Sequence, residues 1–193
     1  MPEGDVSKAE RDRADAAAVE RLRAGDARAV AVLYEHHGRT AFGLALKIVR
    51  DQGDAEDVVH DAFVAIVNRA DQYHPARGSV AAWLVTTVRN LALDRARRRL
   101  RRANIVESEL QHEPVKVAST AEDELVAHGE QSRVLRAMRG LPTVQRETLE
   151  IAFFEGLTYP EIAEREKVPL GTIKSRAARA LHALREALEA DRA

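Results

Sequence analysis

Apolar residues recur at intervals of three and four along most of this chain. That interval is the spacing of one face of an α-helix. The least interrupted stripe consists of Ala55, Val58, Val59, Ala62, Phe63, Ile66, Val67 and Ala70. Asp54, with Asp57 three residues on in the first turn, is predicted to be the N-cap of this helix. The pattern therefore predicts a helix from about residue 54 to residue 70 that is apolar on one side only.

Weaker patterns of the same kind fill most of the remaining chain. The predicted helical stretches are those from Ala16 to Gly25, from Asp26 to just before Asp51, from Ser79 into an arginine-rich segment, from about Glu124 through Met138, and from Pro142 to Gly156. The stretch after residue 102 has weak periodicity and contains Pro114, which is typical of a linker.

We therefore predict an all-α protein of two small helical domains joined by a flexible linker. The predicted parts are a disordered tail at residues 1–14, an N-terminal domain at 15–102, the linker at 103–124 and a C-terminal domain at 125–193.

The C-terminal domain ends in the pattern of a helix-turn-helix. Thr158 and Glu161 have the spacing of a capping box, which marks the start of a short helix. Pro169 and Gly171 then interrupt the chain before a longer second helix. The apolar stripe predicted to be buried along this second helix consists of Ile173, Ala177, Leu181, Leu184 and Leu188.

The first turns of this second helix carry polar and basic residues outside the apolar stripe, namely Lys174, Ser175, Arg176 and Arg179. In a helix-turn-helix, such positions meet the base edges and phosphates of a DNA major groove. The simpler alternative is a solvated helix whose arginines keep the protein soluble.

The formal net charge of −1 conceals two blocks of opposite sign. Seven arginines and a single acid, Asp94, lie between Arg89 and Arg102. Seven acids and a single base, Lys116, lie between Glu107 and Glu130. A few arginines at a helix end could simply complement the helix dipole, but a block this dense favours contact with a phosphate backbone.

Chemistry by this chain is not indicated. The sequence lacks cysteine, so it has no disulfide, thiolate nucleophile or cysteine-ligated zinc. We find no phosphate-binding glycine loop or hydrolase motif, and we expect no enzyme activity, no cofactor and no metal. There is no long apolar run, so we expect no membrane segment and a cytoplasmic protein.

Three groups of residues have more than one interpretation. The acidic cluster from Asp54 to Asp61 lies opposite the apolar stripe, as either a solvated face or a docking face for a basic partner; a metal site is the weaker interpretation. His36 and His37 have no acid at useful spacing and are interpreted as surface or partly packed residues. Trp83 suits either the core or stacking on a nucleic-acid base.

Three stretches together resemble the bacterial RNA polymerase sigma factors of the extracytoplasmic-function (ECF) type. They are residues 54–63, residues 75–84 leading into 89–94, and residues 141–176. The resemblance covers roughly Asp15 to Leu188. His60 stands where the family often has glutamine, and Lys167 stands where glycine is common before the turn.

The resemblance implies a role for each polar cluster. The residues implied to dock on the polymerase are Asp54, Asp57, His60 and Asp61. Those implied to contact the minus-ten element or its backbone are Trp83, Arg89, Asn90, Asp94, Arg95, Arg97 and Arg98. Those implied to read the minus-thirty-five element are Thr172, Lys174, Ser175, Arg176 and Arg179.

By the same resemblance, the chain is expected to bind core RNA polymerase and promoter DNA. It would direct promoter recognition, promoter melting and transcription initiation at a specific regulon, under the control of an anti-sigma factor. Two other classes remain open: a helix-turn-helix repressor or activator that binds an operator without polymerase, and a helical metal-binding protein.

Overall fold

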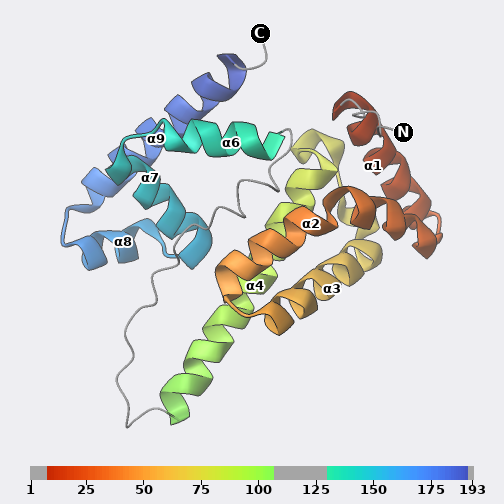
Figure 1. Cartoon of the computed structure of the whole chain (residues 1–193), viewed down its shortest axis with the longest axis horizontal. Helices are drawn as coiled ribbons and strands as arrows, with labels where there is room; N and C mark the ends of the chain where they lie inside the picture. The colour runs from red at the N-terminus through yellow and green to blue at the C-terminus, as the bar shows by residue number, and fades with distance from the viewer. Residues whose placement is uncertain (1–7, 107–129, 191–193) are drawn as a thin grey trace. The chain divides into compact units, whose positions relative to one another are not determined.

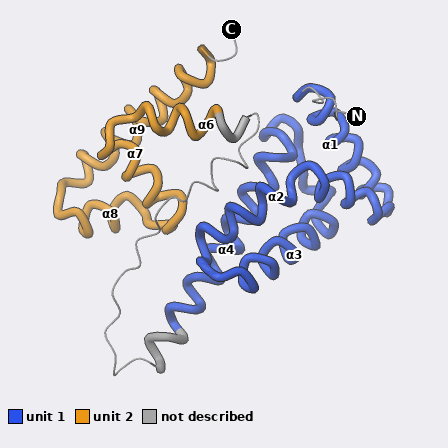
Figure 2. Tube along the Cα trace, in the orientation of Figure 1, with its two compact units in different colours: residues 1–108 blue, residues 109–193 orange. Residues whose placement is uncertain are grey.

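In the computed structural model, the chain divides into two units, residues 1–108 and residues 109–193 (Figure 2). The structure describes residues 8–106 and 130–190, and within these ranges the side chains of 8–101 and 133–190. Every regular element in these ranges is a helix, in agreement with the all-α prediction. The predicted linker at 103–124 lies mostly outside the described residues.

The first unit is built on three helices that contact one another pairwise: α2 (Val30–Val49), α3 (Gln52–Asn68) and α4 (Val80–Val106) (Figure 1). A helix at the N-terminal end, α1 (Lys8–Arg23), contacts α2. Short 3-10 turns connect these helices at Ala27–Ala29, Ala70–Gln72 and Pro75–Arg77. The core is made of small and branched apolar side chains, including Leu33, Ala45, Val58, Ala62, Ile66, Leu84, Val88 and Ala92.

The apolar stripe of α3 is confirmed. Ala55, Val58, Ala62 and Ile66 are all buried, and the acids of the opposite side face outward. The predicted N-cap was wrong, because Asp51 and not Asp54 caps α3. The Asp51 side chain accepts a hydrogen bond from the Asp54 backbone N–H at 2.9 Å. Arg50 adopts a left-handed conformation, which brings Asp51 into the extended geometry that an N-cap requires.

Two boundaries of the first unit differ from the prediction. Helix α1 begins at Lys8, so residues 8–14 are helical although the sequence pattern placed them in a disordered tail. Helix α4 continues to Val106, beyond the predicted domain end at residue 102. The buried Val19 anchors α1 on the C-terminal side of its charged first turns, and the buried Val88 anchors α4 on the N-terminal side of its last turns.

The second unit contains α6 (Glu130–Arg139), α7 (Thr143–Glu150), a π-helical turn (Ile151–Glu155), α8 (Tyr159–Glu166) and α9 (Leu170–Ala190). Helices α6, α7 and α8 all contact α9. A small core forms where α8 meets α9, around the buried side chains of Ile162, Ala163 and Ile173.

The predicted capping box and the glycine that precedes the helix-turn-helix are both confirmed. The Thr158 N–H donates to the Glu161 carboxylate at 2.7 Å, and the Glu161 N–H donates to the Thr158 hydroxyl at 3.5 Å, forming a complete capping box. Gly156 has φ 68° and ends the preceding turn in the left-handed region. Thr158 and Glu161 therefore fix the direction in which α8 leaves the π-helical turn.

One residue of the predicted α9 stripe was wrong. Leu181 is 52% exposed, and Ala180 is buried in its place beside Ile173 and Ala177. A stripe with the 3.6-residue period runs through positions 173, 177, 180 and 184, so Leu181 lies to one side of its centre. Leu184 and Leu188 are half-buried.

Candidate docking and nucleic-acid surfaces

The acidic side of α3 is the first candidate surface. Asp57, His60 and Asp61 are exposed, and Asp54 is half-buried at the N-terminal end of the same side. Carboxylates in the first turns of a helix are stabilised by the positive end of the helix dipole. This side of α3 therefore offers negative charge to a basic partner without disturbing the apolar stripe behind it.

Two of these acids are held by an arginine of α4. Arg95 donates through Nε to Asp54 Oδ1 at 2.8 Å and through Nη2 to Asp57 Oδ2 at 2.7 Å. Arg99 extends the network, with its Nη1 at 3.5 Å from Asp54 Oδ2. The hydrogen bonds that Arg95 donates to Asp54 and then to Asp57 raise the pKa of Arg95 above its ordinary value. Residues assigned by resemblance to polymerase docking and to DNA contact thus meet in one charged cluster.

The other polar residues of α4 divide by exposure. Arg97, Arg98 and Arg101 are exposed along the helix, as is Asn90. Arg98 Nη2 lies 2.5 Å from Asp94 Oδ2 one turn back, and Arg89 and Asp94 are half-buried. The exposed arginines leave positive charge on α4 where a phosphate backbone could approach it.

Trp83 is partly built into the first unit. Its ring lies beside that of Tyr73, with the ring centroids 5.5 Å apart and the planes inclined by 31°. Tyr73 is buried, which raises the pKa of its hydroxyl, and this hydroxyl donates to the Gly78 carbonyl oxygen at 3.2 Å. Trp83 itself is half-buried, so part of its surface stays open to a ligand.

The helix-turn-helix places its predicted DNA contacts unequally. Lys174, Ser175 and Arg179 are exposed near the start of α9, and Arg179 donates to the Ser175 hydroxyl at 3.0 Å. Thr172 is half-buried at the turn. The exposed side chains form a polar, positively charged edge suited to phosphates and base edges.

Arg176 has a different environment from its neighbours on α9. Its Nη1 donates to Glu166 Oε2 of α8 at 2.6 Å, and both side chains are mostly buried, with 20% and 25% of their surfaces exposed. Arg176 therefore joins the two helices of the helix-turn-helix, a role that its sequence position alone did not indicate.

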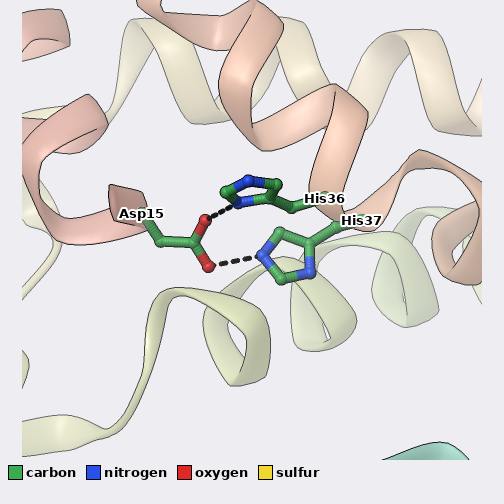
Figure 3. Close-up of side chains that lie close together, drawn as sticks. All are labelled: Asp15, His36 and His37. Carbon is green, nitrogen blue, oxygen red and sulfur yellow. Dashed lines mark hydrogen bonds and ion pairs between the residues drawn. The ribbon is translucent and has the colours of Figure 1, made fainter. Parts of the chain in front are cut away.

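The sequence analysis missed a cluster in the first unit (Figure 3). Asp15 of α1 lies between His36 and His37 of α2, with 2.6 Å from one carboxylate oxygen to His36 Nδ1 and 2.6 Å from the other to His37 Nε2. Asp15 is only 1% exposed. Burial raises the pKa of its carboxyl, but the hydrogen bonds from His37 and His36 outweigh burial, so the pKa lies below its ordinary value.

Both histidines are half-buried, in agreement with the partly packed interpretation, but the sequence analysis did not identify Asp15 as their shared partner. Asp15 precedes His36 by 21 positions, so no local spacing could have joined them. The available signal was Asp15 itself, an acid within the alanine run 14–18 and four residues before the apolar Val19 of α1.

Within the ranges that the structure describes, no helix is long and apolar enough to cross a membrane.

Comparison with known proteins places both units in one family. Residues 33–102 match Sigma-70 region 2, and residues 131–184 match Sigma-70, region 4. The ECF RNA polymerase sigma factor SigK of Mycobacterium ulcerans is 34% identical over 167 residues, covering 86% of this chain and 89% of the relative. SigK of Mycobacterium tuberculosis is 33% identical over 174 residues, covering 90% of this chain and 92% of the relative.

Solved structures with sequence similarity include Rhodobacter sphaeroides SigE in complex with the anti-sigma ChrR, at 32% identity and a TM-score of 0.45. That match covers 89% of this chain and 97% of the SigE chain. CnrH in complex with the cytosolic domain of CnrY matches at 25% identity and a TM-score of 0.43, covering 92% of this chain and 99% of CnrH. On the sequence matches to both sigma regions and to full-length relatives, this chain belongs to the ECF family of RNA polymerase sigma factors.

Proposed function

We infer that this chain binds core RNA polymerase and directs it to promoters, where transcription initiates. The observation that carries this function is the presence of Sigma-70 region 2 and Sigma-70 region 4 in one chain, in that order and in separate helical units. A sigma factor is a specificity subunit and not an enzyme. The covalent chemistry of transcription belongs to the polymerase, and this chain contributes binding and positioning.

The second unit is assigned to the upstream promoter element. The start of α9 would enter the major groove, with Lys174 and Arg179 contacting phosphates and Ser175 close to base edges. These three side chains are exposed and lie in the first turns of the helix. Arg176 would set the position of α9 on α8 through Glu166, or exchange that partner for a base when DNA is bound.

The first unit is assigned to the downstream element and to strand separation. Binding an unstacked base outside the duplex costs a few kcal/mol, and contacts to the released strand must supply this energy. Asn90 and Arg97 are exposed on α4, and half-buried Trp83 lies at the start of the same helix. Amide, guanidinium and aromatic groups of this kind bind single-stranded DNA through hydrogen bonds, charge and stacking.

The acidic side of α3 is assigned to polymerase docking. Asp57 and Asp61 are exposed, so a basic partner reaches them without any rearrangement of the helix. In the unbound protein, Arg95, which the proposal assigns to DNA contact, hydrogen-bonds to Asp54 and Asp57 of this docking surface. Docking would precede DNA opening, so polymerase would meet these acids while Arg95 is bound to them. We also propose, from the family, an anti-sigma factor as the regulatory partner and the cytoplasm as the place of action.

Reconstituted transcription tests this function. The purified chain is added to core polymerase that lacks a specificity subunit, with genomic DNA fragments as templates and mapping of the transcript ends. We expect transcripts that start at defined sites and disappear when either partner is omitted. Protection of a two-fold operator by the chain alone, with no defined transcript in its presence, would instead identify a repressor or activator.

A further inference from the structure

We propose that Asp15, His36 and His37 form a binding site for one divalent transition-metal ion, Zn²⁺ being the best suited. The possible ligand atoms are a carboxylate oxygen of Asp15, Nδ1 of His36 and Nε2 of His37, which lie within 4.8 Å of one another. Two imidazoles and one carboxylate form a common ligand set for catalytic and regulatory zinc and for Co²⁺ and Ni²⁺. The proposal does not depend on the promoter-binding function.

The cluster holds a carboxylate in a buried place. Asp15 is 1% exposed, and among the described residues its side-chain hydrogen-bond partners are the two imidazoles. Asp12, Asp15 and Arg23 lie close enough to the Tyr73 hydroxyl for their charges to shift its pKa. Arg23, however, donates to the carbonyl oxygens of Ala70 and Tyr73. A buried carboxylate is costly unless it is paired, and a divalent ion would supply the positive charge.

The change from the hydrogen-bonded to the metal-bound arrangement is small. Each imidazole nitrogen now lies 2.6 Å from a carboxylate oxygen. In a tetrahedral zinc site with bonds of about 2.1 Å, adjacent ligand atoms are separated by about 3.4 Å. Side-chain shifts of less than about 1 Å would lengthen the two N···O distances to this value, and the three ligand atoms already lie within 4.8 Å of one another.

Metal binding changes which nitrogen of each imidazole carries the proton. In the hydrogen-bonded cluster, His36 Nδ1 and His37 Nε2 carry the protons that they share with Asp15. To bind the ion, each neutral imidazole presents a lone pair at that nitrogen and carries its proton on the other ring nitrogen. A histidine that is protonated beforehand releases one proton to solvent.

The site is open enough for entry and for a further ligand. The side chains of His36 and His37 keep 23% and 13% of their surfaces exposed, while Asp15 forms the closed floor. Three protein ligands with an open side leave a coordination position for water. In Figure 3 both rings face the oxygen end of the Asp15 carboxylate, each next to a different oxygen.

The location of the site gives it a structural consequence. Asp15 lies on α1, outside the part that matches Sigma-70 region 2, whereas His36 and His37 lie within it. Metal binding would therefore fasten α1 to the part that matches Sigma-70 region 2. None of the three residues is among the acids of α3 assigned to polymerase docking or the residues of α9 assigned to DNA contact.

Isothermal titration of the full chain with zinc chloride tests the proposal. Any affinity tag must be removed first, because a histidine tag binds the same ions. We expect one ion per chain, and a rise in melting temperature on adding zinc that EDTA reverses. Absence of saturable binding would show that Asp15, His36 and His37 form a hydrogen-bonded cluster and no metal site, and would overturn the proposal.

Variants and ring-nitrogen NMR locate the ion. Affinity should fall at least about tenfold in His36→Gln, His37→Gln and Asp15→Asn, and stay unchanged in His74→Gln, an exposed histidine of the same unit. The two histidine variants keep the test valid if Asp15→Asn fails to fold. Histidine nitrogen spectra should shift at Nδ1 of His36 and Nε2 of His37 on adding zinc. Equal loss in His74→Gln, or shifts at other histidines only, would refute the site.

Discussion

Asp57 accepts a hydrogen bond from Arg95 at 2.7 Å, although the two residues stand 38 positions apart on different helices. By resemblance, Asp57 belongs to the polymerase-docking surface and Arg95 to the DNA-contacting surface. Any change at Asp57 therefore also changes the environment of Arg95. An experiment on the docking surface needs an acid that Arg95 does not touch.

Asp61 meets this requirement, because it is exposed one turn further along α3 and Arg95 hydrogen-bonds to Asp54 and Asp57 instead. We predict that Asp61→Arg weakens binding to core polymerase by at least about tenfold, or about 1.4 kcal/mol, through like-charge repulsion with a basic partner. Glu35→Arg makes the same charge change at an exposed position of another helix, α2, and should have little effect. Surface-immobilised core polymerase gives the affinities, and circular dichroism checks helicity. Equal losses in both variants would remove the assignment of this face.

A second prediction concerns Arg95 and the stability of the first unit. Asp54 has 22% of its side chain exposed and accepts from Arg95 as well as lying near Arg99. Arg95→Ala leaves this carboxylate less well paired, and we expect it to lower the free energy of unfolding by about 1 kcal/mol. Arg101→Ala, at an exposed position of the same helix, should change it by less than about 0.5 kcal/mol.

Urea denaturation followed by circular dichroism measures both free energies. A value for Arg95→Ala that equals that of Arg101→Ala would mean that the Arg95 network contributes nothing measurable to folding. In that case only its role in binding would remain.

The parts of the structure that the sequence predicted are those decided over one or two helical turns. The capping box of Thr158 and Glu161 spans three positions, and the apolar stripe of α3 repeats every three or four. At such distances, helix geometry alone determines which side chains meet. The helix-turn-helix was found for the same reason.

The features that the sequence analysis missed depend on contacts between segments far apart in the sequence, or on the backbone conformation of a single residue. Asp15 reaches His36 only after α1 packs on α2. Asp51 and Asp54 are equally good N-cap residues by type, and the left-handed conformation of Arg50 decides between them. The pair of Arg176 and Glu166 likewise depends on the turn between α8 and α9.

This pair leads to a third prediction. Arg176→Ala should weaken binding to the upstream element by ~1–3 kcal/mol if Arg176 reads a base, and should lower the melting temperature because it also removes the link to Glu166. Lys174→Ala, at an exposed phosphate-contacting position, should weaken binding on all sequences, reduce the salt slope by about 1 and leave the melting temperature unchanged.

Promoter titrations of the holoenzyme at several salt concentrations, with matched and mismatched upstream elements, separate the two variants. A loss for Arg176→Ala that is the same on both elements would assign it to phosphate contact. A melting temperature that does not move would show that its bond to Glu166 adds no stability.

The last prediction concerns Lys167, which stands where the family commonly has glycine. Lys167 ends α8 with φ 55° and ψ 41°, in the left-handed region where a side chain costs roughly 1–2 kcal/mol. Its conformation is required because the N–H of Val168 then bonds back to the Ala163 carbonyl oxygen at 3.0 Å, which closes the helix before the turn. We expect Lys167→Gly to raise the free energy of unfolding of the second unit by up to about 1 kcal/mol, since glycine adopts this conformation without steric cost. Lys167→Ala removes the same charge but keeps the Cβ atom, so it should give no such gain. Thermal unfolding of both variants beside the parent chain measures the difference, and a gain shared by alanine and glycine would trace the effect to charge and not to the backbone.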